Sequence, residues 1–263
     1  INSIKPKIIA STATIKNSED QIKWLFGRNN SKIFPPQVFE FGDTYFSDIV
    51  RSNERLGRIH LGICSTSAGI QTIDARIAAA LLRKIRYILE NKHNEFNYTK
   101  DEIDPYYSLI SYYNTVRHAS SAMRYYESDV KSFMGVISTK FEKDGNKIKE
   151  DLDVRELTGR LPSKEIPDVF QQLDVGLTDK EHPLDALVCT NMLSVGVDIQ
   201  RLSLMLINNQ PKHTSEYIQA SGRIGRRKSS PGLVITSYRY SGARDLSIYE
   251  NFIDFHSTYH KNV

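Results

Sequence analysis

The chain has 263 residues, of which 40% are hydrophobic and 25% are charged, an ordinary composition for a globular protein with a buried core. No apolar run approaches the roughly 20 residues that a membrane-spanning helix needs. The two cysteines, Cys64 and Cys189, match no zinc spacing and fit a reducing compartment. We therefore expect a soluble, cytoplasmic protein, and the start without Met or a secretory signal indicates a segment of a longer one.

Short apolar stretches alternate with stretches of helical periodicity, which is typical of β-α-β units around a parallel sheet. In chain order, strands are predicted at residues 7–12, 58–65, 108–113, 153–157, 185–190, 202–208 and 232–238. Helices are predicted at residues 68–92, 116–133, 163–173 and 244–259. The sequence therefore predicts an α/β domain of three layers with a central, mostly parallel sheet.

Two polar stretches interrupt this pattern, at residues 34–53 and 90–105. We divide the chain accordingly. Residues 1–57 form an N-terminal connecting or insertion segment, and residues 58–105 form a strand, a long helix and a linker. Residues 106–263 form the core domain.

The strongest functional signal is the run QASGRIGR at residues 219–226. Its glycines allow close backbone approach, and we expect its arginines, Arg223 and Arg226, to project from the start of a helix. Arginine suits phosphate because its planar fork binds oxyanions through two hydrogen bonds and keeps its charge. Residues 201–263 hold nine Lys or Arg against four Asp or Glu, and five of these cations lie between residues 212 and 228. The alternative is a basic surface turn.

Two weaker signals accompany it. The run TNMLSVGVD at residues 190–198 follows an apolar strand, and parallel sheets place ligand contacts at such strand ends. There Thr190 could bind a nucleic-acid phosphate, and Asp198 could meet a ribose or a neighbouring arginine. The run ASTATI at residues 10–15 ends the first strand with short hydroxyl side chains, which more often form turns or helix caps.

Together and in this order, these segments resemble the motifs of superfamily 2 helicases. Residues 11–14 resemble motif III, YYNTVR at residues 112–117 resembles motif IV, residues 190–198 resemble motif V and residues 219–226 resemble motif VI. The run STATIKNSEDQIKWLFGR, followed by FPPQ and GDTYF, is similar to the helicase component of DISARM-type anti-phage systems, of the DrmA kind. The resemblance covers nearly the whole chain and implies the second RecA-like half of a helicase.

The resemblance also implies roles for single residues. Three would act catalytically at the phosphates of ATP: Arg223, Arg226 and Gln219. Three would lie beside the nucleotide: Gly196, Asp198 and Gly222. Four would hold the nucleic-acid backbone: Thr190, Asn114, Arg117 and Arg160. Two would couple hydrolysis to strand movement: Ser11 and Thr14.

The chain lacks G-x-x-x-x-G-K-[ST], the loop that cradles the phosphates of ATP (Walker A). The run DEID at residues 101–104 resembles the acidic DExx box, but it follows a polar stretch and lies after motif III. We expect it to be a solvated loop. His256 and His260 are spaced as a metal pair would be, but no third ligand is evident, so no metal site is expected. ATP and Mg would be bound mainly by an upstream RecA-like half, and this chain alone would be inactive.

The resemblance thus implies the C-terminal half of an ATP-dependent DNA helicase or translocase in anti-phage defence. Its partners would be DNA, held through phosphates, the upstream half of the same protein and other defence subunits, with no membrane. Three alternatives remain open. The chain could be a non-catalytic nucleic-acid-binding module, a duplex translocase that never separates strands, or an interaction scaffold in which both arginines are dispensable.

Overall fold

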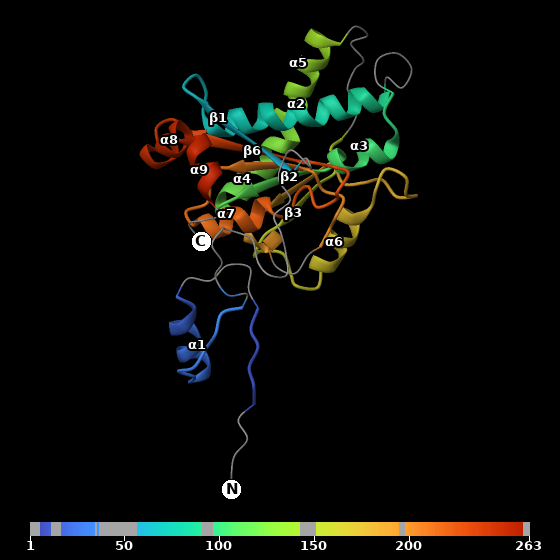
Figure 1. The fold of residues 1–263 in the computed structure, drawn as a ribbon. Coiled ribbons are helices and arrows are strands. Elements are labelled where there is room, and N and C mark those ends of the chain that lie inside the picture. Colours follow the sequence, from blue (N-terminus) through green and yellow to red (C-terminus); the bar gives the residue numbers. More distant parts are fainter. Residues whose placement is uncertain are drawn as a thin grey trace.

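A computed structural model of the chain describes residues 6–11, 17–34, 36, 57–90, 97–142, 151–194 and 198–259. Its centre is a six-stranded sheet with the strand order β1-β6-β5-β2-β4-β3 (Figure 1). The strands are β1 (Arg58–Ser65), β2 (Leu109–Tyr113), β3 (Val154–Leu157), β4 (Ala186–Cys189), β5 (Leu204–Asn208) and β6 (Gly232–Arg239). Each neighbouring pair is parallel, which confirms the predicted α/β fold.

Helices lie between the strands, as the sequence predicts. They are α1 (Ser18–Phe26), α2 (Ile70–Glu90), α3 (Lys100–Tyr107), α4 (Val116–Tyr125), α5 (Lys131–Phe141), α6 (Ile166–Asp174), α7 (Thr214–Ser221), α8 (Ala243–Glu250) and α9 (Phe252–Thr258). Of these, α1, α3 and α7 were not among the predicted helices. A π-helical turn, η1 (Tyr126–Val130), joins α4 to α5, and a 3₁₀ turn, η2 (Asn191–Ser194), follows β4. No helix in these described ranges is long and apolar enough to cross a membrane.

The sheet is buried on both faces, as α/β folds require. Alternation along β2 sends Ile110 and Tyr112 to one face, where they pack with residues of α6 and α7. Leu109 and Tyr113 point to the other face and pack with α2, α4 and η1. Figure 1 shows these helices as two layers with the sheet between them. Burial on both faces explains why the central strands are almost continuous apolar runs.

The edge strand β1 is part of this sheet. It pairs with β6 along its whole length, from Arg58 opposite Gly232 to Ser65 opposite Arg239. At Gly62 an added Cβ would lie 2.8 Å from the ring of Phe252, so the absence of a side chain lets α9 pack closely on the strand. In Figure 1, α1 lies apart from the three layers, and it buries none of its residues.

Three predictions were wrong. Residues 7–11 form no strand and are exposed, and residue 12 lies outside the described part. An extended segment without a neighbouring strand has no backbone partner to stabilise it. The helix at residues 244–259 is broken at Asn251, whose backbone and side-chain amides both donate to the Ser247 carbonyl oxygen, at 3.2 and 2.9 Å.

The third error concerns the run DEID at residues 101–104, which lies in α3 and not in a solvated loop. Thr99 and Glu102 form a capping box that begins the helix, with Glu102 Oε2 accepting from the Thr99 amide at 2.8 Å. Asp104, one turn further, is buried against Arg201. The run is therefore a structural helix start that carries one buried carboxylate.

Candidate nucleotide and nucleic-acid sites

The expected site residues lie at opposite edges of the sheet. Asn114 follows β2, Thr190 follows β4 and Arg160 follows β3, so these lie where the strands end, which we call the carboxyl edge. The helix α7 starts after β5 and runs back beside it. Residues 222–227, the arginine loop, therefore lie at the opposite or amino edge, where the Gly225 amide donates to the Leu202 carbonyl oxygen just before β5 (2.8 Å).

The arginine loop follows the end of a helix, which corrects the expectation that Arg223 and Arg226 project from a helix start. The last helical residue is Ser221, and the Gly222 amide closes the helix on the Ile218 carbonyl oxygen at 2.8 Å. Gly225 has a φ of +64°, which favours glycine, and a Cβ there would lie 2.4 Å from the Gly232 nitrogen. The expected close backbone approach is therefore found at this glycine.

Asp198 and Arg226 meet directly. Arg226 donates from Nη1 to Oδ1 of Asp198, and its Nε lies 3.3 Å from the Gly222 carbonyl oxygen. The sequence anticipated Asp198 beside an arginine, and this contact joins the segment at residues 190–198 to the arginine loop. Gly196, from the same segment, lies outside the described residues.

Arg223 is half-buried close to Arg226. Burial, and then the charge of Arg226, hold the pKa of the Arg223 guanidinium below its usual value. The charge of Asp198 acts in the opposite direction and raises the pKa of Arg223. A further anion near both guanidiniums would reduce their mutual repulsion. Gln219 lies one turn earlier on α7 and is also half-buried. The chemistry of this loop suits a polyphosphate.

Tyr217 anchors α7, the helix that carries this loop, and sequence reasoning missed it. Its hydroxyl lies 3.0 Å from Nδ1 of His60 on β1 and 2.9 Å from Nε2 of His256 on α9. Nδ1 of His256 lies 2.8 Å from the Phe252 carbonyl oxygen, so Nδ1 carries the proton and Nε2 accepts from the tyrosine. His256 is therefore a packing residue, and His260 lies outside the described part.

A buried ion pair lies beside the same loop, and the sequence analysis did not predict it. The Arg201 guanidinium, 2% exposed, donates to the Asp104 carboxylate at 2.9 Å and to the Leu173 carbonyl oxygen at 3.0 Å. Arg227, at the end of the arginine loop, lies 3.8 Å from the other Asp104 oxygen. The loop is thus tied to α3 and α6 through charges that no local pattern reveals.

At the carboxyl edge, the expected residues divide into exposed and engaged ones. Arg117 is exposed on the first turn of α4, and Arg160 is exposed while its Nη1 donates to Ser120 Oγ at 2.6 Å. The Asn114 amide donates to the Asn208 and Asn209 carbonyl oxygens at 3.2 and 2.7 Å, so it ties the ends of β2 and β5. Thr190 is only 5% exposed. Of the four residues expected here, Arg117 and Arg160 are the accessible cations.

The two expected coupling residues are Ser11 and Thr14. Ser11 is exposed in residues 6–11, a described stretch that forms no strand, and Thr14 lies outside the described residues.

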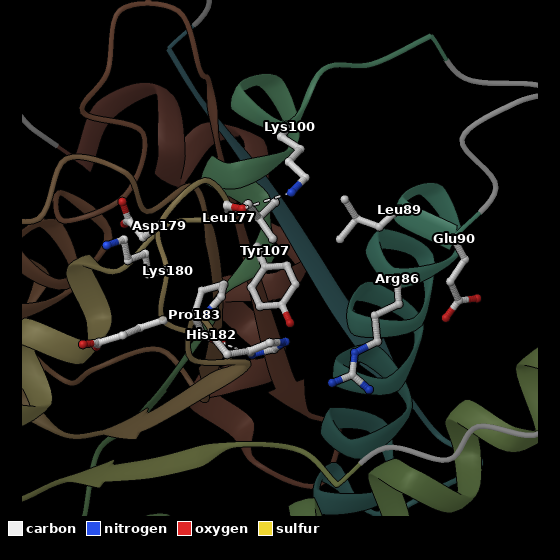
Figure 2. Close-up of a pocket in the computed structure, with 11 residues that line it drawn as sticks. Arg86, Leu89, Glu90, Lys100, Tyr107, Leu177, Asp179, Lys180, His182 and Pro183 are labelled. Carbon is white, nitrogen blue, oxygen red and sulfur yellow. Dashed lines mark hydrogen bonds between the residues drawn. The ribbon is translucent and has the colours of Figure 1, made fainter.

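A separate cavity of about 370 Å³ opens between the end of α2, α3 and residues 177–183 (Figure 2). Tyr107, His182 and Arg86 converge on it. Its charges are largely engaged, since Arg86 binds Asp185 at 2.8 Å and the Lys100 ammonium lies 3.4 Å from the Leu177 carbonyl oxygen. None of the expected site residues lines it. Within the described ranges, no three His, Cys, Asp or Glu side chains are grouped to hold a metal ion.

Comparison with known proteins identifies the family to which part of the chain is similar. Residues 116–228 match the family described as the helicase conserved C-terminal domain, which includes both edges described above. These residues belong to the helicase conserved C-terminal domain family. The chain is 40% identical over 253 residues to the DISARM protein DrmA of Bacillus paralicheniformis, and the match covers 96% of the chain and 22% of that protein.

Two further similarities were found. Over 72 residues the chain is 40% identical to the Druantia protein DruE of Escherichia coli, covering 27% of the chain and 4% of that protein. The fold also matches the DUF1998 helicase MrfA bound to DNA and AMPPNP, with a TM-score of 0.50 and 16% identity over 79% of the chain and 24% of that structure. The chain thus spans less than a quarter of each relative.

Proposed function

We propose that the chain is the C-terminal RecA-like half of an ATP-dependent DNA helicase or translocase that acts in anti-phage defence. The observation that carries this proposal is the arginine loop, where Arg223 and Arg226 come together beside Asp198. Mutual repulsion of the two guanidiniums favours a bound triphosphate. The 40% identity to a DISARM protein over 96% of the chain supports the defence role. DNA is proposed as the substrate because the DUF1998 helicase MrfA, whose fold is similar, was solved bound to DNA.

In this proposal one edge of the sheet binds ATP and the other binds nucleic acid. At the amino edge, Arg223 and Arg226 contact the triphosphate and stabilise the charge that develops during hydrolysis, an effect worth about 10³–10⁵ in rate for such arginines. At the carboxyl edge, Arg117 and Arg160 bind nucleic-acid phosphates without regard to sequence. Helix α7 spans the distance between them, so movement of the loop on hydrolysis would reach the nucleic-acid side.

ATP completes its site only with an upstream RecA-like half. This chain has no phosphate-binding loop of the G-x-x-x-x-G-K-[ST] type, and the described residues offer no acidic cluster for Mg. We propose that the upstream half supplies both. Its chemistry is the transfer of the γ-phosphoryl group to water, and this chain contributes the two guanidiniums.

The test is DNA-stimulated ATP hydrolysis by the full-length protein and its Arg226→Ala variant. Arg155→Ala is the matched control, because Arg155 lies on the opposite edge strand β3 and pairs with Asp153 at 3.4 Å across an exposed surface. We expect Arg226→Ala to be nearly inactive and Arg155→Ala to match the parent. Equal rates in all three would reject the proposal and favour a non-catalytic binding module. A strand-displacement assay then separates a helicase from a duplex translocase.

A further inference from the structure

Arg58, the first residue of β1, is hydrogen-bonded to the backbone of the arginine loop, although the two are far apart in the sequence. Its Nε donates to the Ile224 carbonyl oxygen at 2.7 Å and its Nη2 to the Gly222 carbonyl oxygen at 3.2 Å. These two carbonyls flank Arg223. One planar guanidinium therefore bonds the backbone on both sides of Arg223.

The sheet holds Arg58 in place to do this. Arg58 lies opposite Gly232 in the parallel register of β1 and β6. Gly232 in turn packs on Gly225 of the loop, since a Cβ at Gly232 would lie 3.1 Å from Gly225. The position of Arg58 is thus fixed by the strand ladder, and it does not depend on the conformation of the loop.

The loop needs such a restraint. It begins where α7 ends, so the carbonyls of Gly222 and Ile224 are no longer bonded within a helix. It also carries two guanidiniums, and burial, followed by the charge of Arg226, lowers the pKa of Arg223. Within the loop, the Gly222 carbonyl oxygen accepts a longer bond from Arg226 Nε, at 3.3 Å. The bonds from Arg58 add to this contact, and without them the segment between Gly222 and Ile224 could rotate and carry Arg223 away from Arg226.

We propose that Arg58 is a positioning residue for Arg223, and that it fixes the loop in the conformation that presents both arginines to one triphosphate. This inference rests on the proposed function of Arg223 and Arg226. Misplacing a group by about 1 Å can reduce a rate about 100-fold even where the group itself is intact. Removing the restraint should therefore affect the catalytic step and spare the binding of ATP and DNA.

The experiment uses the full-length protein with Arg58→Ala, Arg58→Lys and the edge-strand control Arg155→Ala. We expect kcat for DNA-stimulated ATP hydrolysis to fall roughly tenfold to 100-fold in Arg58→Ala. KM for ATP and the affinity for DNA should stay within about twofold of the parent. Arg58→Lys should recover only part of kcat, because an ammonium cannot bond both carbonyls in one plane. Added guanidinium ion should raise kcat of Arg58→Ala and leave that of Arg155→Ala unchanged.

Each other outcome is decisive. A parental kcat in Arg58→Ala overturns the proposal, and so does a raised KM with unchanged kcat, which would indicate direct contact with the nucleotide. If Arg58→Ala does not fold, Arg58→Lys decides, because a folded lysine variant with the parental kcat overturns the proposal as well. Arg226→Ala separates the two levels. If it is inactive while Arg58→Ala is normal, only the positioning role fails, whereas an active Arg226→Ala variant rejects the proposed function itself.

Discussion

Asp198 and Arg226 form an ion pair that joins motif V to motif VI, 28 residues apart in the sequence. The side chain of Arg226 is 34% exposed and that of Asp198 is 65% exposed. Pairs this open contribute little to stability, because water screens the charges and both side chains lose freedom. The pair therefore matters for where Arg226 points. A phosphate oxygen approaching that guanidinium would compete with Asp198 for the same hydrogen-bond donors.

Replacing Asp198 with Asn tests this directional role. The variant keeps a hydrogen-bond acceptor and removes the charge, so we expect the free energy of unfolding to change by less than about 1 kcal/mol. In the full-length protein, kcat for ATP hydrolysis should fall by about tenfold, since Arg226 loses its orienting partner. Asp151→Asn is the matched control, because Asp151 forms an exposed pair with Lys131 at 2.7 Å far from the loop. Equal activity of the two variants would contradict the role.

In contrast to Asp198, Asp104 should be important for the stability of the fold. Its partner Arg201 is 2% exposed, so Asp104→Ala leaves a buried guanidinium without its counter-charge. We expect the free energy of unfolding to fall by about 3–5 kcal/mol. Asp101→Ala, three residues earlier and exposed on the same helix, should change it by less than about 0.5 kcal/mol. Urea denaturation of both variants measures the difference, and a loss under about 1 kcal/mol for Asp104→Ala would show that the pair is not needed.

The sheet could be predicted because each buried strand has a recognisable local sequence pattern. Leu204–Asn208 and Ala186–Cys189 are buried on both faces, and such strands are short continuous apolar runs in any parallel sheet. The order of the helicase motifs added the RecA-like fold, but it did not predict that the site residues divide between two edges of the sheet. The strand at residues 7–12 was wrong for the same local reason, since an apolar run predicts a strand without telling whether a partner strand is present.

The contacts that shape the arginine loop could not be predicted, because they join residues far apart in the sequence. Arg58 and Ile224 are 166 residues apart, and Arg201 and Asp104 are 97 apart. No pattern marks either pair. Two errors were avoidable, however. The spacing of Thr99 and Glu102 is a capping box that announces α3, and Ser221-Gly222 is a typical helix end, which places Arg223 after a helix.

Asp74 gives the chain a distinctive dependence on pH. The carboxyl group is fully buried on α2 and accepts a hydrogen bond from Asn208 Nδ2 at 2.5 Å. Burial is the main cause that raises its pKa from 3.8 to about 6. Between these values the folded state binds more protons than the unfolded state, so stability falls as pH rises through this window. Above about pH 6 the loss is complete, at about 3 kcal/mol.

Asp74→Asn should remove this loss. The amide oxygen still accepts from Asn208, and the group no longer titrates. Other ionisable groups cancel in the difference between variant and parent, so this difference should shift by roughly 2 kcal/mol in favour of the variant from pH 4 to pH 8. Denaturation curves at several pH values measure it. A difference that is constant with pH would mean that Asp74 does not titrate in this window.

Gly225→Ala should damage the arginine loop specifically. The backbone there has a φ of +64°, and an added Cβ would lie 2.4 Å from the Gly232 nitrogen, so either the loop or the start of β6 must move. We expect a loss of roughly 3 kcal/mol in unfolding free energy or more. Gly159→Ala is the control, because it lies in a loop at the other end of the sheet with nothing within 4 Å of the added Cβ. Equal melting temperatures for the two variants would show that the loop adapts freely.

Replacing Arg117 or Arg160 should change the salt dependence of DNA binding. Each exposed arginine that neutralises one phosphate releases counterions, so its loss weakens binding to every sequence and lowers the slope of log affinity against log salt by about one. We expect this for Arg117→Ala and Arg160→Ala in the full-length protein, measured by fluorescence anisotropy between about 50 and 200 mM salt. Two single-stranded oligonucleotides of unrelated sequence should lose affinity equally.

The control for this slope is Arg155→Ala, an equally charged and half-exposed change on the edge strand β3, which should leave the slope unaltered. A general effect of net charge would lower all three slopes alike. Arg160 carries a further expectation, because its Nη1 already bonds Ser120 Oγ at 2.6 Å and is therefore held against α4. A donor fixed in this way loses less freedom when it binds phosphate, so Arg160→Ala should weaken binding more than Arg117→Ala. The reverse order would place the nucleic-acid strand nearer the first turn of α4 than the end of β3.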